Sequence, residues 1–246
     1  MTSCLTFSIS KLVYFTPVLL GVTRNRPLLA FTSNSLCKRG TVSTNGDCSK
    51  WWERLLSASD PDTEKLVQNN VEIHEDFLSL EEHESLLAEI EPYLKRLRYE
   101  YDHWDDAIHG YRETERKQWN DSNTKILDRV KSVAFQPSEV PLPFVHVLDI
   151  NKDGYIKAHV DSVRFCGRAI AGLSLLSESV MRLVCEKDKS KSGDILLLPR
   201  SLYILRDKAR FDYTHEVLPD KTSMFKGKHI PRSRRISVIS RLEVKQ

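Results

Sequence analysis

The C-terminal half of the chain alternates hydrophobic and polar residues with the two-residue period of half-buried β-strands. Turn-forming sequences, Asn-Lys-Asp-Gly at 151–154 and Pro-Arg at 199–200, separate some of these runs. The pattern predicts eight short strands, over Phe144–Ile150, Tyr155–Val160, Ala169–Leu175, Val180–Cys185, Asp194–Leu198, Ser201–Leu205, Tyr213–Val217 and Arg234–Leu242.

N-terminal to the predicted strands, hydrophobic residues recur with the spacing of an α-helix. Ser79-Leu80-Glu81-Glu82 is a capping-box sequence, in which the hydroxyl accepts a free backbone N–H and the Glu82 carboxylate reaches back. The apolar stripe that follows consists of Leu86, Leu87, Ile90, Tyr93 and Leu94. A second helix is expected over about 122–135, with Ile126, Leu127, Val130 and Val133 facing inward. The elements together predict an α+β fold, a double-stranded β-helix (jelly roll) of about eight strands buttressed by N-terminal helices.

The first 50 residues differ in charge from the rest of the chain. They hold six of the 37 Lys and Arg residues but only one of the 34 Asp and Glu residues. A basic, Ser-rich segment that is nearly free of acids is typical of a mitochondrial transit peptide. A disordered tail and a secretory signal are the alternatives, because residues 12–22 are apolar. That run is short and contains Pro17, so we expect no membrane span.

The remaining residues are expected to contain a linker or lead-in over 51–72 and one catalytic domain over 73–242. Without the leader the formal charge is about −2, which excludes a general polyanion binder. Two of the five cysteines, Cys166 and Cys185, lie outside the leader and show no CxxC spacing, which argues against a disulfide scaffold or zinc site. We expect a monomer.

The sequence His-x-Asp occurs three times, at His74/Asp76, His103/Asp105 and His159/Asp161. Only His159 ends a predicted strand and is followed by a further histidine and arginines late in the sheet region. Residues i and i+2 of a strand point to the same side, so His159 and Asp161 can bind one ion together. The alternative for His159 is a surface histidine on a strand.

His215 is the candidate for a third ligand, because a jelly roll can bring a late strand beside an early one. Its alternative is a hydrogen-bonded core histidine. Two histidines and one carboxylate that occupy one face of a metal are the ligand set of non-haem Fe(II) oxygenases. The three residues are therefore predicted to bind the metal and support catalysis.

Arg235 and Arg241 are six residues apart on one predicted strand and so face the same side. Burying two guanidinium groups is costly unless each has a partner, and a dicarboxylate can bind both. The alternative is an edge strand with solvated arginines. Tyr203 could donate its hydroxyl to the same anion, or it could be an ordinary half-buried strand tyrosine. With three positions of Fe(II) free for a 2-oxo acid and oxygen, the pattern predicts an oxygenase that uses Fe(II), a 2-oxo acid with a second carboxylate, and O2.

These residues and four longer stretches resemble the AlkB-type Fe(II)/2-oxoglutarate dioxygenases, and in particular a mitochondrial branch of that family. The stretches are 98–104, 154–162, 170–177 and 201–206, and the resemblance covers about residues 70–242. It implies a double-stranded β-helix, iron at His159, Asp161 and His215, and 2-oxoglutarate at Tyr203, Arg235 and Arg241. It also implies the mitochondrial matrix and a role in alkylation-induced programmed necrosis and fatty-acid metabolism.

One departure from the family concerns the substrate. Members that repair nucleic acids carry Asn-x-Tyr before His-x-Asp, where this chain has Leu148 and Ile150. The segment 99–135, which precedes the barrel, holds eight acidic and six basic residues, an unfavourable surface for a phosphate backbone. These features favour a protein or small-molecule substrate, and a protein substrate is the first expectation. The alternatives are mitochondrial RNA, bound through the basic loop 219–234, and a non-catalytic, iron-bound signalling scaffold.

Overall fold

The computed structural model describes residues 50–101 and 107–244 of the 246-residue chain. The predicted transit peptide lies outside these residues, apart from its last position. The pair His103/Asp105 also lies outside them.

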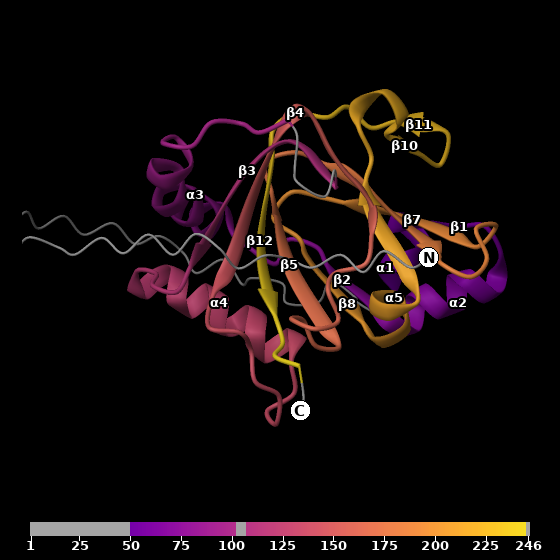
Figure 1. The fold of residues 1–246 in the computed structure, drawn as a ribbon, viewed down its shortest axis with the longest axis horizontal. Helices are drawn as coiled ribbons and strands as arrows, with labels where there is room; N and C mark the ends of the chain where they lie inside the picture. Colours follow the sequence, from indigo (N-terminus) through magenta and orange to yellow (C-terminus); the bar gives the residue numbers. More distant parts are fainter. Residues whose placement is uncertain (1–49, 102–106, 245–246) are drawn as a thin grey trace, which may run out of the picture. The chain divides into compact units, whose positions relative to one another are not determined.

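The centre of the fold is a strongly curled antiparallel sheet of ten strands (Figure 1). Its strands are β1 (Leu56–Ala58), β2 (Val71–His74), β3 (Ile108–Arg116), β4 (Val145–His159), β5 (Ala169–Leu175), β6 (Ser179–Cys185), β7 (Ser192–Leu197), β8 (Leu202–Arg206), β9 (Tyr213–Val217) and β12 (Arg235–Arg241). They follow the order β1-β7-β6-β9-β4-β12-β5-β8-β2, with β3 on β4. β10 (Met224–Phe225) and β11 (Lys228–His229) form a separate hairpin. The α+β fold with a jelly-roll core is confirmed.

β4 is one 15-residue strand, although two strands separated by a turn were expected. Its first part pairs with β12 and its last part with β9, so it joins the two halves of the curled sheet. β3 pairs along both parts, and a register shift near Gly110 accommodates the region that the sequence presents as a turn. Gly110 has a φ of +65°, and a Cβ there would lie 2.8 Å from the Asn151 side chain. A β-bulge at a glycine therefore replaces the predicted turn.

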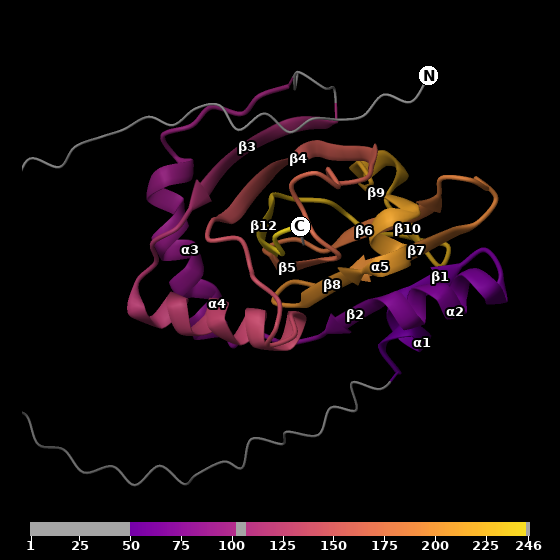
Figure 2. The same cartoon turned by 60° about the horizontal axis from the view of Figure 1, so that its bottom comes forward.

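Two helices cover the outer face formed by β4, β12 and β5. They are α3 (Leu80–Leu94) and α4 (Asp121–Ala134), which lie on the same side of the sheet in both views (Figures 1 and 2). The capping box at Ser79 and Glu82 is confirmed. Their buried residues are Leu86, Ile90, Leu94, Ile126, Leu127, Val130 and Ala134, which pack against alternate residues of the three strands.

Two side chains predicted to face this core point outward instead. Val133 is 37% exposed and Tyr93 is 46% exposed. The ring of Tyr93 lies 4.0 Å from the guanidinium of Arg116, so a cation–π contact holds it at the surface. Phe135, just beyond the end of α4, is buried in the same core.

The segment 51–72, expected as a linker or lead-in, forms helices and strands of the folded unit. It forms α1 (Trp51–Leu55), β1, α2 (Pro61–Asn70) and the start of β2. Asp60 caps α2 by accepting from the backbone N–H groups of Asp62 and Thr63. β1 pairs with β7 and β2 pairs with β8, so the two strands extend both ends of the sheet. The strands have three and four residues, too few for a clear alternating pattern.

The remaining helical elements are α5 (Asp207–Phe211), which connects β8 to β9, and a 3-10 turn at Asp220–Thr222. None of the helices in the described ranges is long and apolar enough to cross a bilayer.

Candidate active site

His159, Asp161 and His215 meet at one point of the curled sheet. His159 ends β4 and is the direct cross-strand partner of His215 on β9, with ring centroids 4.3 Å apart. Asp161 follows two residues after His159, and its Oδ1 lies 3.3 Å from His159 Nε2 and 3.9 Å from His215 Nε2. The three ligand atoms lie within 4.8 Å of one another. The three residues predicted from the sequence are therefore brought together by strand pairing.

The surroundings of the two imidazoles suit metal binding. His159 Nδ1 is 2.9 Å from the backbone carbonyl oxygen of Lys157, to which it donates, and this contact orients the ring with its Nε2 toward Asp161. His215 Nδ1 is buried and has no hydrogen-bond partner within the described residues. Two nitrogens and a carboxylate oxygen that converge in this way fit Fe(II).

Burial and mutual charge set the protonation of this group. Burial, followed by the charge of the neighbouring His159, lowers the pKa of His215 to about 3, so this imidazole is neutral. Burial alone would raise the pKa of Asp161, but Arg241 and the histidines hold it well below the usual range. Burial lowers the pKa of His159, yet the hydrogen bond and charge of Asp161 outweigh it and raise the pKa overall. At neutral pH the carboxylate is ionised, which suits a cation ligand.

Arg235, at the start of β12, is 1% exposed and lies inside the curled sheet. It donates to the Ser237 hydroxyl and hydrogen-bonds to Tyr203, while its Nε has no partner among the described residues. Burial lowers its pKa. Tyr203 lies across Gly172 of β5, where a Cβ would come within 2.3 Å of the tyrosine hydroxyl oxygen. A buried guanidinium with an unused donor is a site for an anion.

Arg241, at the end of β12, lies beside the metal-ligand group. Its Nε is 3.4 Å from Asp161 Oδ2 and its Nη2 is 3.2 Å from His146 Nδ1. Burial lowers the pKa of Arg241, but Asp161, with smaller contributions from Cys166, Tyr203 and Glu115, raises it overall. Each arginine therefore lies on the inner face, as their even spacing predicts.

The described His-x-Asp pair at His74 and Asp76 forms no comparable group. His74 Nε2 lies 3.2 Å from Glu72, while Asp76 forms an ion pair with Arg200.

His146 is the inward polar residue that the sequence analysis missed. Its signal was its even spacing from Leu148 and Ile150 on the same strand.

Leu148 and Ile150 form an apolar wall of the site. They are the cross-strand partners of Ser237 and Arg235 and so share the inner face with the arginines. Both are buried in a group with Ile108, Tyr111, Ile156 and Val217. The two positions supply no polar contact and keep water from that side.

The basic loop 219–234 offers fewer free charges than its sequence indicates. Arg232 is 7% exposed and donates to the carbonyl oxygen of Leu218. Arg234 forms ion pairs with Asp149 and Glu91. Lys221, Lys226 and Lys228 are exposed, although Lys226 Nζ donates to the carbonyl oxygen of Glu53 at 2.8 Å.

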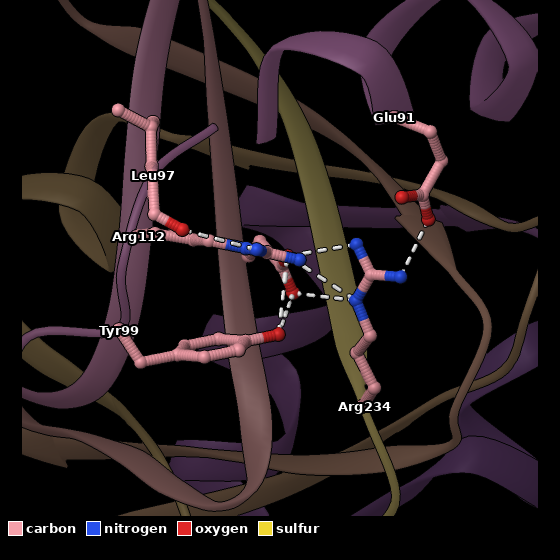
Figure 3. A network of polar contacts seen from close by, with 6 residues as sticks. Glu91, Leu97, Tyr99, Arg112 and Arg234 are labelled. Carbon is pink, nitrogen blue, oxygen red and sulfur yellow. Dashed lines mark hydrogen bonds and ion pairs between the residues drawn. The ribbon is translucent and has the colours of Figure 1, made fainter. Parts of the chain in front are cut away.

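A buried ionic group lies on the outer face of the sheet, opposite the site. Asp149 is fully buried on β4 and accepts from Arg112 Nε at 2.7 Å and from Arg234 Nε and Nη2 at 2.9 and 2.8 Å. Figure 3 shows Arg112 and Arg234 on opposite sides of the group, with the Tyr99 hydroxyl directed into it and Glu91 beyond Arg234. The group thus joins α3, β3, β4 and the segment leading into β12.

Comparison with known proteins agrees with this geometry. The model of the 2OG-Fe(II) oxygenase superfamily matches residues 51–241. Two proteins named alpha-ketoglutarate-dependent dioxygenase alkB homolog 7, mitochondrial, from Bos taurus and Mus musculus, are each 54% identical over 175 residues, which is 71% of this chain and 79% of each relative.

Solved structures share the fold at low sequence identity. OsALKBH1 has a TM-score of 0.53 and 14% identity, over 70% of this chain and 97% of that one. A Pseudomonas putida prolyl-4-hydroxylase has a TM-score of 0.51 and 14% identity, over 75% of this chain and 97% of that one. The chain belongs to the 2OG-Fe(II) oxygenase superfamily, as an AlkB-type dioxygenase that uses Fe(II), 2-oxoglutarate and O2.

Proposed function

We propose that His159, Asp161 and His215 hold the Fe(II), and that Tyr203, Arg235 and Arg241 hold 2-oxoglutarate. The observation that carries this proposal is the convergence of the three ligand atoms beside Arg241. When bound, the iron centre couples oxidative decarboxylation of 2-oxoglutarate to oxidation of a C–H bond.

Different residues are placed for the two carboxylates of the co-substrate. Arg241 touches Asp161 and so is placed for the carboxylate end nearest the metal. Arg235, with Tyr203 beside it, is placed for the other carboxylate, because its burial leaves a guanidinium that needs an anion. Leu148 and Ile150 exclude water from one side of the same space.

The test is Fe(II)-dependent release of succinate from 2-oxoglutarate. His159→Ala should abolish release, and His74→Ala, which changes the histidine of another His-x-Asp pair, should leave it intact. Succinate release that persists in His159→Ala would contradict the ligand assignment. A wild-type chain that binds both iron and 2-oxoglutarate without turnover would favour the non-catalytic scaffold.

The substrate proposed for hydroxylation is a protein. Glu115 and Glu113 of β3 are the cross-strand partners of His146 and Leu148, so two carboxylates share the face on which the co-substrate residues lie. Carboxylates at this position repel a phosphate backbone and are compatible with a polypeptide. Hydroxylation of a peptide library, measured as a mass increase of one oxygen atom, tests this substrate class.

Mitochondrial RNA is the second candidate, and oxidative demethylation would be the reaction. The exposed lysines 221, 226 and 228 favour it, since they lie in the loop that leads to β12. The ion pairs of Arg234 and the burial of Arg232 count against it.

A mitochondrial location, in the matrix, is proposed for the chain. The names of the two mammalian relatives and the composition of the first 50 residues support it. The roles in programmed necrosis and fatty-acid metabolism, and a monomeric state, stay proposals. Imaging of a tagged full-length chain, with and without residues 1–50, tests the location.

A further inference from the structure

His146 lies on the inner face of the sheet, among the residues assigned to 2-oxoglutarate. It is the cross-strand partner of Ile239, just as Leu148 and Ile150 are the partners of Ser237 and Arg235. The side chain is 6% exposed. His146 therefore supplies the polar group on a stretch of β4 whose next two inward positions are apolar.

The two ring nitrogens of His146 have different partners. Nδ1 lies 3.2 Å from Arg241 Nη2, and Nε2 lies 2.8 Å from Glu113 Oε2. A guanidinium can only donate, so Nδ1 accepts from Arg241 and carries no proton. Nε2 then carries the proton and donates to the Glu113 carboxylate. Glu113 thereby selects the tautomer of His146 whose Nδ1 can accept a hydrogen bond from Arg241.

Arg241 needs such a partner because its contact with Asp161 is long, at 3.4 Å. Arg235 is held in place by Ser237 and Tyr203. Arg241 makes no hydrogen bond to a hydroxyl among the described residues, and the imidazole of His146 takes that place. The Arg241 guanidinium donates to His146 Nδ1 through Nη2, and its other N–H groups can donate to a carboxylate.

We propose that His146 is a positioning residue that orients Arg241 for the carboxylate of 2-oxoglutarate, and that Glu113 fixes the tautomer required for this. The proposal rests on the assignment of Arg241 to the co-substrate. It adds two residues, from β3 and β4, to the group that determines co-substrate affinity.

The test is a double-mutant cycle on 2-oxoglutarate binding by the full-length chain. The protein is loaded with Fe(II) under anaerobic conditions, and binding is followed by calorimetry and by the visible charge-transfer absorption of the complex. His146→Leu should weaken binding about tenfold, because one hydrogen bond to a charged group is lost. His146→Asn, whose side-chain oxygen can accept near the position of Nδ1, should stay within about threefold of the wild type. Metal content should not change in either variant.

The double-mutant cycle distinguishes an effect of His146 on the orientation of Arg241 from an effect of His146 on packing. In an Arg241→Ala background, His146→Leu should cause no further loss, because the residue acts through Arg241. A full additional loss there, or an equal loss in His146→Asn and His146→Leu, would overturn the proposal. Unchanged affinity in Arg241→Ala alone would instead refute the assignment of Arg241 to the co-substrate.

Glu113 provides a second variant whose folding is not at risk, since its side chain is 35% exposed. Glu113→Gln keeps an acceptor for Nε2–H and should bind 2-oxoglutarate like the wild type. Glu113→Ala frees the imidazole and should weaken binding about threefold. Wild-type affinity in Glu113→Ala would show that the carboxylate does not fix the tautomer.

Discussion

Arg234 and Arg235 are neighbours in the chain and contact opposite faces of the sheet. Arg234 forms ion pairs with Asp149 and Glu91 on the side of α3, while Arg235 lies among Ser237 and Tyr203 on the inner side. The alternation of side chains along a strand produces this division. The buried ion pair therefore fixes the backbone from which Arg235, the arginine proposed to bind the co-substrate, projects.

Loss of the Asp149 charge should destabilise the protein strongly. Asp149→Asn leaves Arg112 and Arg234 without their shared anion in a buried place, and breaking such a group costs about 3 kcal/mol or more of unfolding free energy. Urea denaturation measures it. Asp153→Asn, the same change at an exposed position of β4, is the control and should lie within about 0.5 kcal/mol of the wild type. Equal stability of the two variants would contradict the role given to Asp149.

Arg235→Ala should raise the 2-oxoglutarate requirement while iron stays bound. The variant removes a buried guanidinium from the proposed anion site, and we expect at least about tenfold weaker co-substrate binding. Calorimetry with 2-oxoglutarate and metal analysis of the same samples measure the two properties. Arg182→Ala, which removes an arginine paired with Asp194 on another strand, should change neither. Unchanged co-substrate affinity in Arg235→Ala would count against its assignment.

Metal binding should stabilise the wild-type chain and not the Asp161→Ala variant. A ligand that binds only the folded state raises its apparent stability, by about 2.7 kcal/mol at one hundred times its dissociation constant. Thermal unfolding with and without added Fe(II) under anaerobic conditions measures this effect. Asp76→Ala removes the aspartate of another His-x-Asp pair and should retain the metal-induced shift. An equal shift in Asp161→Ala and the wild type would place the metal elsewhere.

The salt dependence of RNA binding separates the two proposed substrates. If the substrate is a protein, Lys226→Ala combined with Lys228→Ala should leave the slope of log binding constant against log salt unchanged. Lys187→Ala with Lys189→Ala, both exposed in the β6–β7 loop, is the matched control. A slope reduced by about one for each lysine of the 219–234 loop, with no change in the control, would favour RNA.

Sequence reasoning was most reliable where a strong period coincided with chemically distinctive residues. His159, Asp161 and His215 were predicted from their motif and order, and the structure brings them together. The helices α3 and α4 were predicted from capping and spacing. In contrast, β1 and β2 are too short to show a period, and their pairing with β7 and β8 is a tertiary effect.

Two strands were predicted where the structure has the single strand β4, and here too the pairing with another strand decides the outcome. Asn151-Lys152-Asp153-Gly154 has the composition of a turn, but β3 pairs on both sides of it through the bulge at Gly110. His146 was missed because its even spacing from Leu148 and Ile150 places it on their face of the strand but matches no known motif. Its partners, Glu113 and Arg241, come from strands distant in the sequence.

Because β4 is one continuous strand, it connects the outer layer of the sheet with the candidate metal site. One strand bears Asp149, which needs the outer helical layer, and His159, which completes the centre for a redox-active ion. Because one strand carries both groups, we expect the packing of the outer helical layer and the convergence of His159, Asp161 and His215 to form together on folding.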